Sequence, residues 1–235
     1  MTTEGLTTYE LDGRIATITL DDGKVNAFSH AMLRAVHAEL DQAERDNAVT
    51  VITGREGFLS AGFDLKVFAA GGEPVREMLV LGATLYERIL GFRTPVVVAC
   101  PGHAIAAGAF LPLAADARIC VDGPFRIGLN EVKIGLTVPW FAIELARQRL
   151  TRRDFDRGVI SAHEYGPAEA VTAGFFDRLV APQDLHAAAL ETAAGLAELN
   201  AEAHTATKLR VRKGALEAIR LAIESELLGE QVLAG

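Results

Sequence analysis

The segment FRIGLNEVKIGL, residues 125–136, contains a single carboxylate, Glu131, among apolar, small and basic residues. Gly128, Asn130 and Gly135 are typical turn formers. A glutamate in this setting either lies on the surface of a tight turn or points into an apolar cavity. In a cavity, burial would raise the pKa of its carboxyl group toward neutrality, so that it could remove and return a proton. The segment therefore supplies one candidate acid–base group.

Two loops of small residues could supply the matching electrostatic group: LSAGFDLK at 59–66 and GHAIAAGAF at 102–110. Each loop is expected to join a strand end to a helix N-terminus, where the first backbone N–H groups have no intrahelical partner. Five small residues would let a ligand oxygen approach that backbone: Ala61, Gly62, Ala106, Ala107 and Gly108. Two N–H donors on one carbonyl oxygen form an oxyanion hole. Tight packing would need the same small residues, so both interpretations stay open.

Other common chemistries find no support in the sequence. It has no G-x-G-x-x-G after a strand, no G-x-x-x-x-G-K-[ST] phosphate loop and no G-x-S-x-G nucleophile motif. The six histidines are scattered without an H-x-x-x-H pair, and no C-x-x-C is present, so we expect no metal site. His103, which follows Gly102, is interpreted as a packed loop residue.

The composition limits the class of protein and its partners. The chain of 235 residues is 50% hydrophobic and 23% charged, which fits one large globular domain. No apolar run reaches the roughly 18 residues of a membrane span, and the N-terminal segment does not resemble a signal peptide. The net charge of −8 argues against nucleic acid as a partner. Cys100 and Cys120 lie in apolar runs, which predicts buried free thiols and a cytoplasmic location.

Strand and helix patterns alternate along the chain before helices take over. Strand-like runs occupy 7–11, 14–20, 49–53 and 95–100, and helical patterns occupy 30–45, 75–90 and 201–229. This order predicts an α/β core followed by a C-terminal helical region. The basic run KLRVRKGALEAIR in the last helix is either a solvated face or a contact for a phosphate on a small ligand.

Three motifs in matching order resemble the crotonase (enoyl-CoA hydratase/isomerase) superfamily. They are SAGFDLK, PGHAIAAGAFLPLAADARI and FRIGLNEVKIGLTVPW, and KVNAFS at 24–29 adds to them. The resemblance runs from about residue 7 to 185, and its specificity comes from the spacing of the motifs. It implies a crotonase-like spiral of ββα units over 1–185, with a helical region at 186–235 that serves trimerisation or covers the CoA. It also implies a homotrimer or dimer of trimers, and no cofactor, because coenzyme A is part of the acyl-CoA thioester substrate.

The resemblance also implies roles for particular residues. The thioester oxygen would meet the backbone N–H groups of Phe63 and Ala107, where Ala107 replaces the middle glycine of the family's Gly-Gly-Gly run. Ala61 matches the residue whose backbone meets the adenine, and Lys24 and Lys66 match positions near the CoA nucleotide.

Hydratases of this superfamily use two glutamates, and here only the second is present. Phe110 takes the place of the first, whereas Glu131 keeps the second. One carboxylate is sufficient to move a double bond from C3 to C2. The stretch from IGLNE to Trp140 and Phe141 is similar to mitochondrial-type Δ3,Δ2-enoyl-CoA isomerases, and both aromatic residues are expected to shape the acyl pocket. The sequence therefore favours such an isomerase in β-oxidation. A hydratase or other crotonase-type enzyme, and a catalytically silent acyl-CoA binder, are the alternatives.

Overall fold

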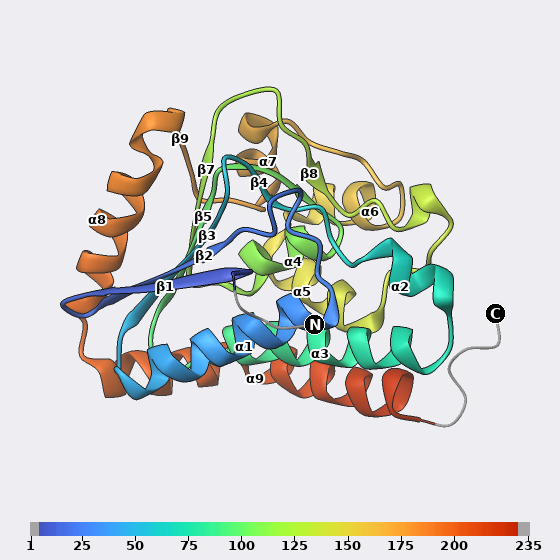
Figure 1. Ribbon diagram of the computed structural model, residues 1–235, viewed down its shortest axis with the longest axis horizontal. Helices are drawn as coiled ribbons and strands as arrows, with labels where there is room; N and C mark the ends of the chain where they lie inside the picture. Colours follow the sequence, from blue (N-terminus) through green and yellow to red (C-terminus); the bar gives the residue numbers. More distant parts are fainter. Residues whose placement is uncertain (1–4, 230–235) are drawn as a thin grey trace.

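Two sheets organise the computed structural model, which describes residues 5–229 (Figure 1). The larger sheet has the strand order β1 (Thr7–Asp12), β2 (Ile15–Leu20), β3 (Val49–Gly54), β5 (Val96–Cys100), β7 (Ala117–Val121) and β9 (Arg178–Val180). Only its first pair is antiparallel. The smaller, parallel sheet contains β4 (Gly57–Ser60), β6 (Gly102–Ile105) and β8 (Ile127–Gly128).

Helices follow the strand pairs in a repeating order. They are α1 (His30–Arg45), α2 (Leu65–Ala70), α3 (Glu73–Leu90), α4 (Ala107–Ala114), α5 (Trp140–Arg149), α6 (Arg152–Val159), α7 (Pro167–Ala173), α8 (Leu185–Ala197) and α9 (Ala201–Ala222). Short 3₁₀ turns η1 (Val132–Ile134) and η2 (Pro182–Asp184) and the π-turn η3 (Ile223–Leu227) complete the chain. In three successive units, the first strand joins the large sheet and the second joins the small one. This arrangement confirms the expected spiral of ββα units.

The large sheet is covered on both faces. Helix α8 packs against one face of β3, β5 and β7, and the larger hydrophobic core lies on the other face, with α1, α3, α4 and α5 (Figure 1). A parallel strand covered on both faces needs continuous apolar sequence. All five residues of β5 are buried, as the run at 95–100 predicted. The sheets therefore hold the loops that follow β4 and β6 on a rigid base.

The predicted elements are confirmed with small changes at their ends. The hairpin pairs Asp12 with Ile15, and its turn contains Gly13 at a φ of +57°. Ser29 caps α1 by accepting a hydrogen bond from the Met32 N–H at 3.2 Å. The last α-helix is shorter than the expected 201–229. It ends at Ala222, and the chain then forms the π-turn η3. None of the helices in the described part of the chain is long and apolar enough to cross a membrane.

Helix α9 packs on α3 and α5 of its own chain. Some cations of its basic run are therefore buried, and others are exposed. The Lys208 ammonium group is buried and contacts the Asp116 carboxylate at 2.7 Å and the Phe92 carbonyl oxygen at 2.9 Å. Arg212 is also buried and lies 3.0 Å from Asp116. Arg210 and Lys213 are exposed. The run is therefore a solvated face only in part, since its buried cations hold α9 against the core. Roles of this region in trimerisation or in covering CoA stay predictions.

Candidate active site

The loops that follow β4 and β6 lie in direct contact. Gly62 has a φ of +95°, and a Cβ atom built there would come within 3.0 Å of the Ala106 Cβ and within 3.3 Å of the Ala107 nitrogen. A side chain at Gly62 would therefore be strained by the backbone conformation and crowded by the facing loop. The small residues of these loops predicted either tight packing or an oxyanion hole, and tight packing is present.

Two backbone N–H groups at this contact have no backbone acceptor in the described part of the chain. Ala107 begins α4, so its N–H has no intrahelical acceptor. Phe63 lies between Gly62, whose carbonyl accepts from Phe28, and Asp64, whose N–H donates to Phe28. Neither the Phe63 N–H nor the Ala107 N–H donates to a backbone carbonyl within residues 5–229. Two donors without a backbone acceptor on neighbouring loops are compatible with an oxyanion hole, and that role stays a prediction.

The conformation of Ala106 turns the chain into α4. Its φ of +50° is unusual for a residue with a side chain. Hydrogen bonds hold both of its polar backbone groups, because its N–H donates to Gly128 and its carbonyl accepts from Ala109, each at 2.8 Å. The bond to the Ala106 carbonyl holds the peptide unit whose N–H belongs to Ala107, and the bond from its N–H holds the preceding unit.

A cavity of about 180 Å³ adjoins the two loops. Its walls come from α2, α3, α4 and η1, and are largely apolar: Leu65, Phe68, Leu79, Phe110, Ile134 and Leu136. Ala61, Phe63 and Ala106 bring the loops to its surface, and Glu131 is the one carboxylate among its described lining residues. The cavity can therefore enclose an apolar group beside this acid and the two loops, with Phe63 and Ala106 at its surface.

Glu131 is buried, with 6% of its surface exposed, immediately before η1. Its Oε2 atom has no hydrogen-bond partner among the described residues. Loss of solvent raises the pKa of its carboxyl group to about 7, and a hydrogen bond from its own backbone N–H opposes this shift more weakly. Of the two settings that the sequence left open, the structure shows the buried one. A carboxyl group with this pKa can both accept and return a proton near neutral pH.

Phe110 forms an apolar wall of the same cavity. It is fully buried in α4, with its ring at right angles to Tyr86 (centroids 5.4 Å apart) and to Phe141 (5.8 Å). It offers no proton to a substrate and no hydrogen bond to a water molecule. The place that a second acid would take is therefore apolar.

The structure corrects the expectation for Trp140 and Phe141, because neither lines the cavity. Helix α5 begins at Trp140, and its helical turn directs the two side chains differently. Trp140 is 60% exposed to solvent, whereas Phe141 is fully buried behind Phe110 and stacks on Tyr86. Pro139, just before the helix, contributes to the cavity instead.

The expected CoA-contacting residues lie in or beside the β4 loop. Ala61 lines the cavity, and its N–H donates to the Val25 carbonyl at 2.9 Å. Its carbonyl oxygen accepts from no backbone N–H within residues 5–229, and its contact with CoA stays a prediction. Lys24 and Lys66 are exposed and do not line the cavity. Their place at the surface suits contacts with a charged nucleotide rather than with an acyl chain.

Tyr86 and Gly82 contribute to this site although the sequence analysis did not identify them. The Tyr86 hydroxyl donates to the Ala107 carbonyl at 2.8 Å, and the Phe63 ring packs directly on Gly82. The sequence did offer a signal for Tyr86, which lies among the apolar residues of the helix pattern at 75–90. A tyrosine buried there needs a hydrogen-bond partner for its hydroxyl.

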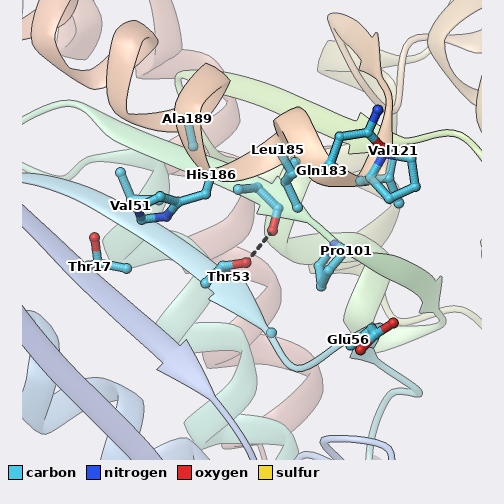
Figure 2. Close-up of a pocket in the computed structure, with 13 residues that line it drawn as sticks. Thr17, Val51, Thr53, Glu56, Pro101, Val121, Gln183, Leu185, His186 and Ala189 are labelled. Atoms are coloured by element: carbon cyan, nitrogen blue, oxygen red, sulfur yellow. Dashed lines mark hydrogen bonds between the residues drawn. The ribbon is translucent and has the colours of Figure 1, made fainter.

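A larger cavity of about 420 Å³ lies between the large sheet and α8 (Figure 2). The Thr53 hydroxyl on its floor already donates to the Ala99 carbonyl at 2.8 Å (dashed in Figure 2). Glu56 and His186, at its edge, are exposed. Without a buried acid, this cavity is less suited to proton transfer than the one at Glu131. Among the described residues, no group of three or more His, Cys, Asp or Glu could hold a metal ion.

A family model described as enoyl-CoA hydratase/isomerase matches residues 10–229. The chain belongs to the enoyl-CoA hydratase/isomerase family. The matched residues include Phe63, Ala107 and Glu131, so the site just described lies within the matched span. The expected resemblance to the crotonase superfamily is confirmed.

Solved structures of this family share the fold over almost the whole chain. An enoyl-CoA hydratase/isomerase family protein from Pseudomonas syringae is 48% identical, with a TM-score of 0.95 over 97% of this chain and 99% of that chain. An enoyl-CoA isomerase from Mycobacterium tuberculosis is 42% identical, with a TM-score of 0.91 over 96% of this chain and 98% of that chain.

Curated relatives in the family bear several kinds of name, isomerase and hydratase among them. Human mitochondrial enoyl-CoA delta isomerase 1 is 27% identical over 85% of this chain and 68% of its own length. A probable enoyl-CoA hydratase of Bacillus subtilis is 34% identical over 60% of this chain, and the match spans 55% of that relative's length. The human relative confirms the expected similarity to mitochondrial-type isomerases. The two names leave the choice of reaction to the chemistry of the site.

Proposed function

We propose that this protein is a Δ3,Δ2-enoyl-CoA isomerase, which converts a 3-enoyl-CoA into the 2-trans-enoyl-CoA. The observation that carries the proposal is that buried Glu131 is the one carboxylate among the described residues lining a largely apolar cavity, whose wall also includes Phe110. Moving a double bond needs one group that removes a proton from C2 and returns one to C4. Adding water needs, in addition, a place for the water and a group that moves its proton.

The reaction follows from the groups around the cavity. The Glu131 carboxylate removes a proton from C2, and the negative charge moves to the thioester oxygen. The N–H groups of Phe63 and Ala107 stabilise that oxygen, which lowers the barrier by several kcal/mol, about 3 for each donor. Protonated Glu131 then returns the proton at C4, so that the double bond lies between C2 and C3 and the carboxylate is regenerated.

The apolar cavity supports this reaction over hydration. Desolvation holds the pKa of the Glu131 carboxyl group at about 7, which makes it a stronger base than an exposed glutamate and also a usable acid. Phe110 keeps water from the charged intermediate. The proposal extends by family resemblance to CoA contacts at Lys24, Ala61 and Lys66, to a homotrimer or dimer of trimers, and to a cytoplasmic place in β-oxidation.

The main alternative is an enoyl-CoA hydratase, the activity named for the Bacillus subtilis relative. Purified protein incubated with a 3-enoyl-CoA and, separately, with a 2-enoyl-CoA distinguishes the two. The proposal expects the absorbance of a conjugated thioester to appear from the first substrate without a change of mass. Hydration of the second at a comparable rate would contradict it.

Variants at two glutamates connect the activity with the site. Glu131→Gln is expected to abolish isomerisation, because an amide cannot take the C2 proton. Glu164→Gln is the matched control, since Glu164 is also largely buried but pairs with Lys133 at 3.0 Å outside the cavity. Binding of the acyl-CoA by the wild type without any turnover would favour the third possibility, a silent acyl-CoA binder.

A further inference from the structure

Helix α3 touches the first oxyanion-hole loop through Gly82. A Cβ atom built on Gly82 would lie 2.5 Å from both Cε1 and Cζ of the Phe63 ring. No side chain larger than hydrogen fits between them, so the ring rests on the backbone of α3. Phe63, whose N–H is one of the two donors, is therefore supported by a helix that lies outside its own loop.

Four residues later, the same helix touches the second loop through Tyr86. Residues at this spacing share one face of a helix. The Tyr86 hydroxyl donates to the carbonyl of Ala107 at 2.8 Å. Its fully buried ring stacks on Phe141 and meets Phe110 edge to face, which leaves the hydroxyl little freedom to move. The second N–H donor therefore belongs to a residue whose carbonyl α3 holds.

We propose that α3 is the positioning element of the oxyanion hole, with Gly82 seating Phe63 and Tyr86 fixing Ala107 so that both N–H groups meet one thioester oxygen. This inference rests on the proposed acyl-CoA site. Ala106 gives it a physical reason, because its φ of +50° is strained and persists only where neighbouring bonds hold it. The hydrogen bond from the Tyr86 hydroxyl to the Ala107 carbonyl stabilises this conformation from a helix outside both loops.

Tyr86 acts here as a positioning residue and not as an acid. Burial, together with the nearby charge of Glu131, raises the pKa of its phenol well above the ordinary value. Its proton therefore stays on the oxygen and is committed to the Ala107 carbonyl. Its removal should misplace a donor without changing the titration of the acid–base group.

Tyr86→Phe tests the hydroxyl and leaves the packed ring in place. The direct readout is the infrared carbonyl stretch of a bound 2-enoyl-CoA labelled with carbon-13 at the thioester, because an oxyanion hole lowers this frequency. The variant is expected to lose most of the frequency shift and to lower kcat on the order of tenfold with little change in KM. The pH profile should keep its midpoint.

Tyr165→Phe is the matched control, since Tyr165 is also buried and its hydroxyl donates to a backbone carbonyl, that of Asp154, at 3.2 Å. A general effect of losing a buried phenol would appear in both variants, whereas the carbonyl shift should change only in Tyr86→Phe. An unchanged shift in Tyr86→Phe, or an equal loss in Tyr165→Phe, overturns the proposal.

Gly82→Ala tests the other half, because the added methyl group must push the Phe63 ring away. Its control is Gly195→Ala in α8, where a Cβ atom meets nothing within 4 Å. Only Gly82→Ala should reduce the carbonyl shift. If the wild type lowers the carbonyl frequency of the bound thioester but does not isomerise a 3-enoyl-CoA, the proposed reaction is wrong. The variants still decide the role of α3 in that case. If the wild type shows no shift on binding, the proposed role of α3 is overturned.

Discussion

Glu131 and Phe110 line one cavity, and the Glu131 Oε2 atom finds no hydrogen-bond partner there among the described residues. A buried carboxylate without a partner is costly unless it takes up a proton, and this is why its pKa rises. The apolar ring therefore does more than replace an acid. It contributes to the dry surroundings that tune the acid which remains.

The pH dependence of the reaction should report this tuning. Isomerisation begins with ionised Glu131, and burial raises its pKa to about 7. We expect kcat/KM for a 3-enoyl-CoA to rise about tenfold per pH unit on the acid side and to level off above pH 7. Rates measured between about pH 5 and about pH 9 check this. A midpoint near 4.5, the ordinary value for a glutamate, would show that the carboxyl group is solvated.

The same shift should appear in the stability of the fold. Folded Glu131 holds its proton up to about pH 7, whereas the unfolded chain releases it near 4.5. The folded state thus binds more protons within this window, so stability falls as the pH rises through it, by up to about 3 kcal/mol. Glu131→Gln should lack this fall and be the more stable form above pH 7. Urea unfolding of both proteins across the window measures the difference, and parallel curves would contradict the assignment.

Replacing Phe110 should undo the tuning. Phe110→Ala leaves room that a water molecule can enter, with Glu131 Oε2 as a partner. The midpoint of the pH profile should move from about 7 toward 4.5, and the free energy of unfolding should drop by about 3 to 5 kcal/mol. Phe175→Ala is a matched control, because Phe175 is equally buried but packs on Tyr165. It should lower stability similarly and leave the midpoint in place.

The sequence predicts most of the fold because its signals are local. The apolar run at 95–100 is typical of a strand covered on both faces, and Ser29 marks the start of α1. Glu131 was also readable, since turn formers and apolar residues surround it. Gly62 and Ala107 belonged to motifs whose small residues are required by the contact between two loops.

What the sequence could not provide depends on helix rotation and on distant partners. Trp140 and Phe141 are neighbours at the start of α5, and a small difference in where the helix begins decides which of them faces inward. The Tyr86 hydroxyl finds its acceptor in Ala107, on another helix. Lys208 looks like a surface cation until the fold brings Asp116 to it.

The contact between Lys208 and Asp116 also yields a prediction about how α9 is held. The Asp116 side chain is 9% exposed and forms ion pairs with Lys208 at 2.7 Å and with Arg212 at 3.0 Å. Asp116→Asn keeps the shape but leaves two buried cations without a counter-charge, which should lower the free energy of unfolding by about 3 kcal/mol or more at pH 7. Urea unfolding measures the loss, and Glu217→Gln, in the exposed pair with Lys213, should give no measurable change.

The pH dependence of that loss separates charge from packing. Burial already lowers the pKa of the Lys208 ammonium group, and the Asp116 carboxylate opposes this shift. Without Asp116 the pKa should fall further, so that folded Lys208 binds its proton less tightly than the unfolded chain does. Stability of Asp116→Asn should therefore rise with pH as Lys208 becomes neutral, and its deficit against the wild type should shrink between about pH 7 and about pH 10. A deficit that stays constant over this range would mean that lost hydrogen bonds, and not the buried charges, cause it.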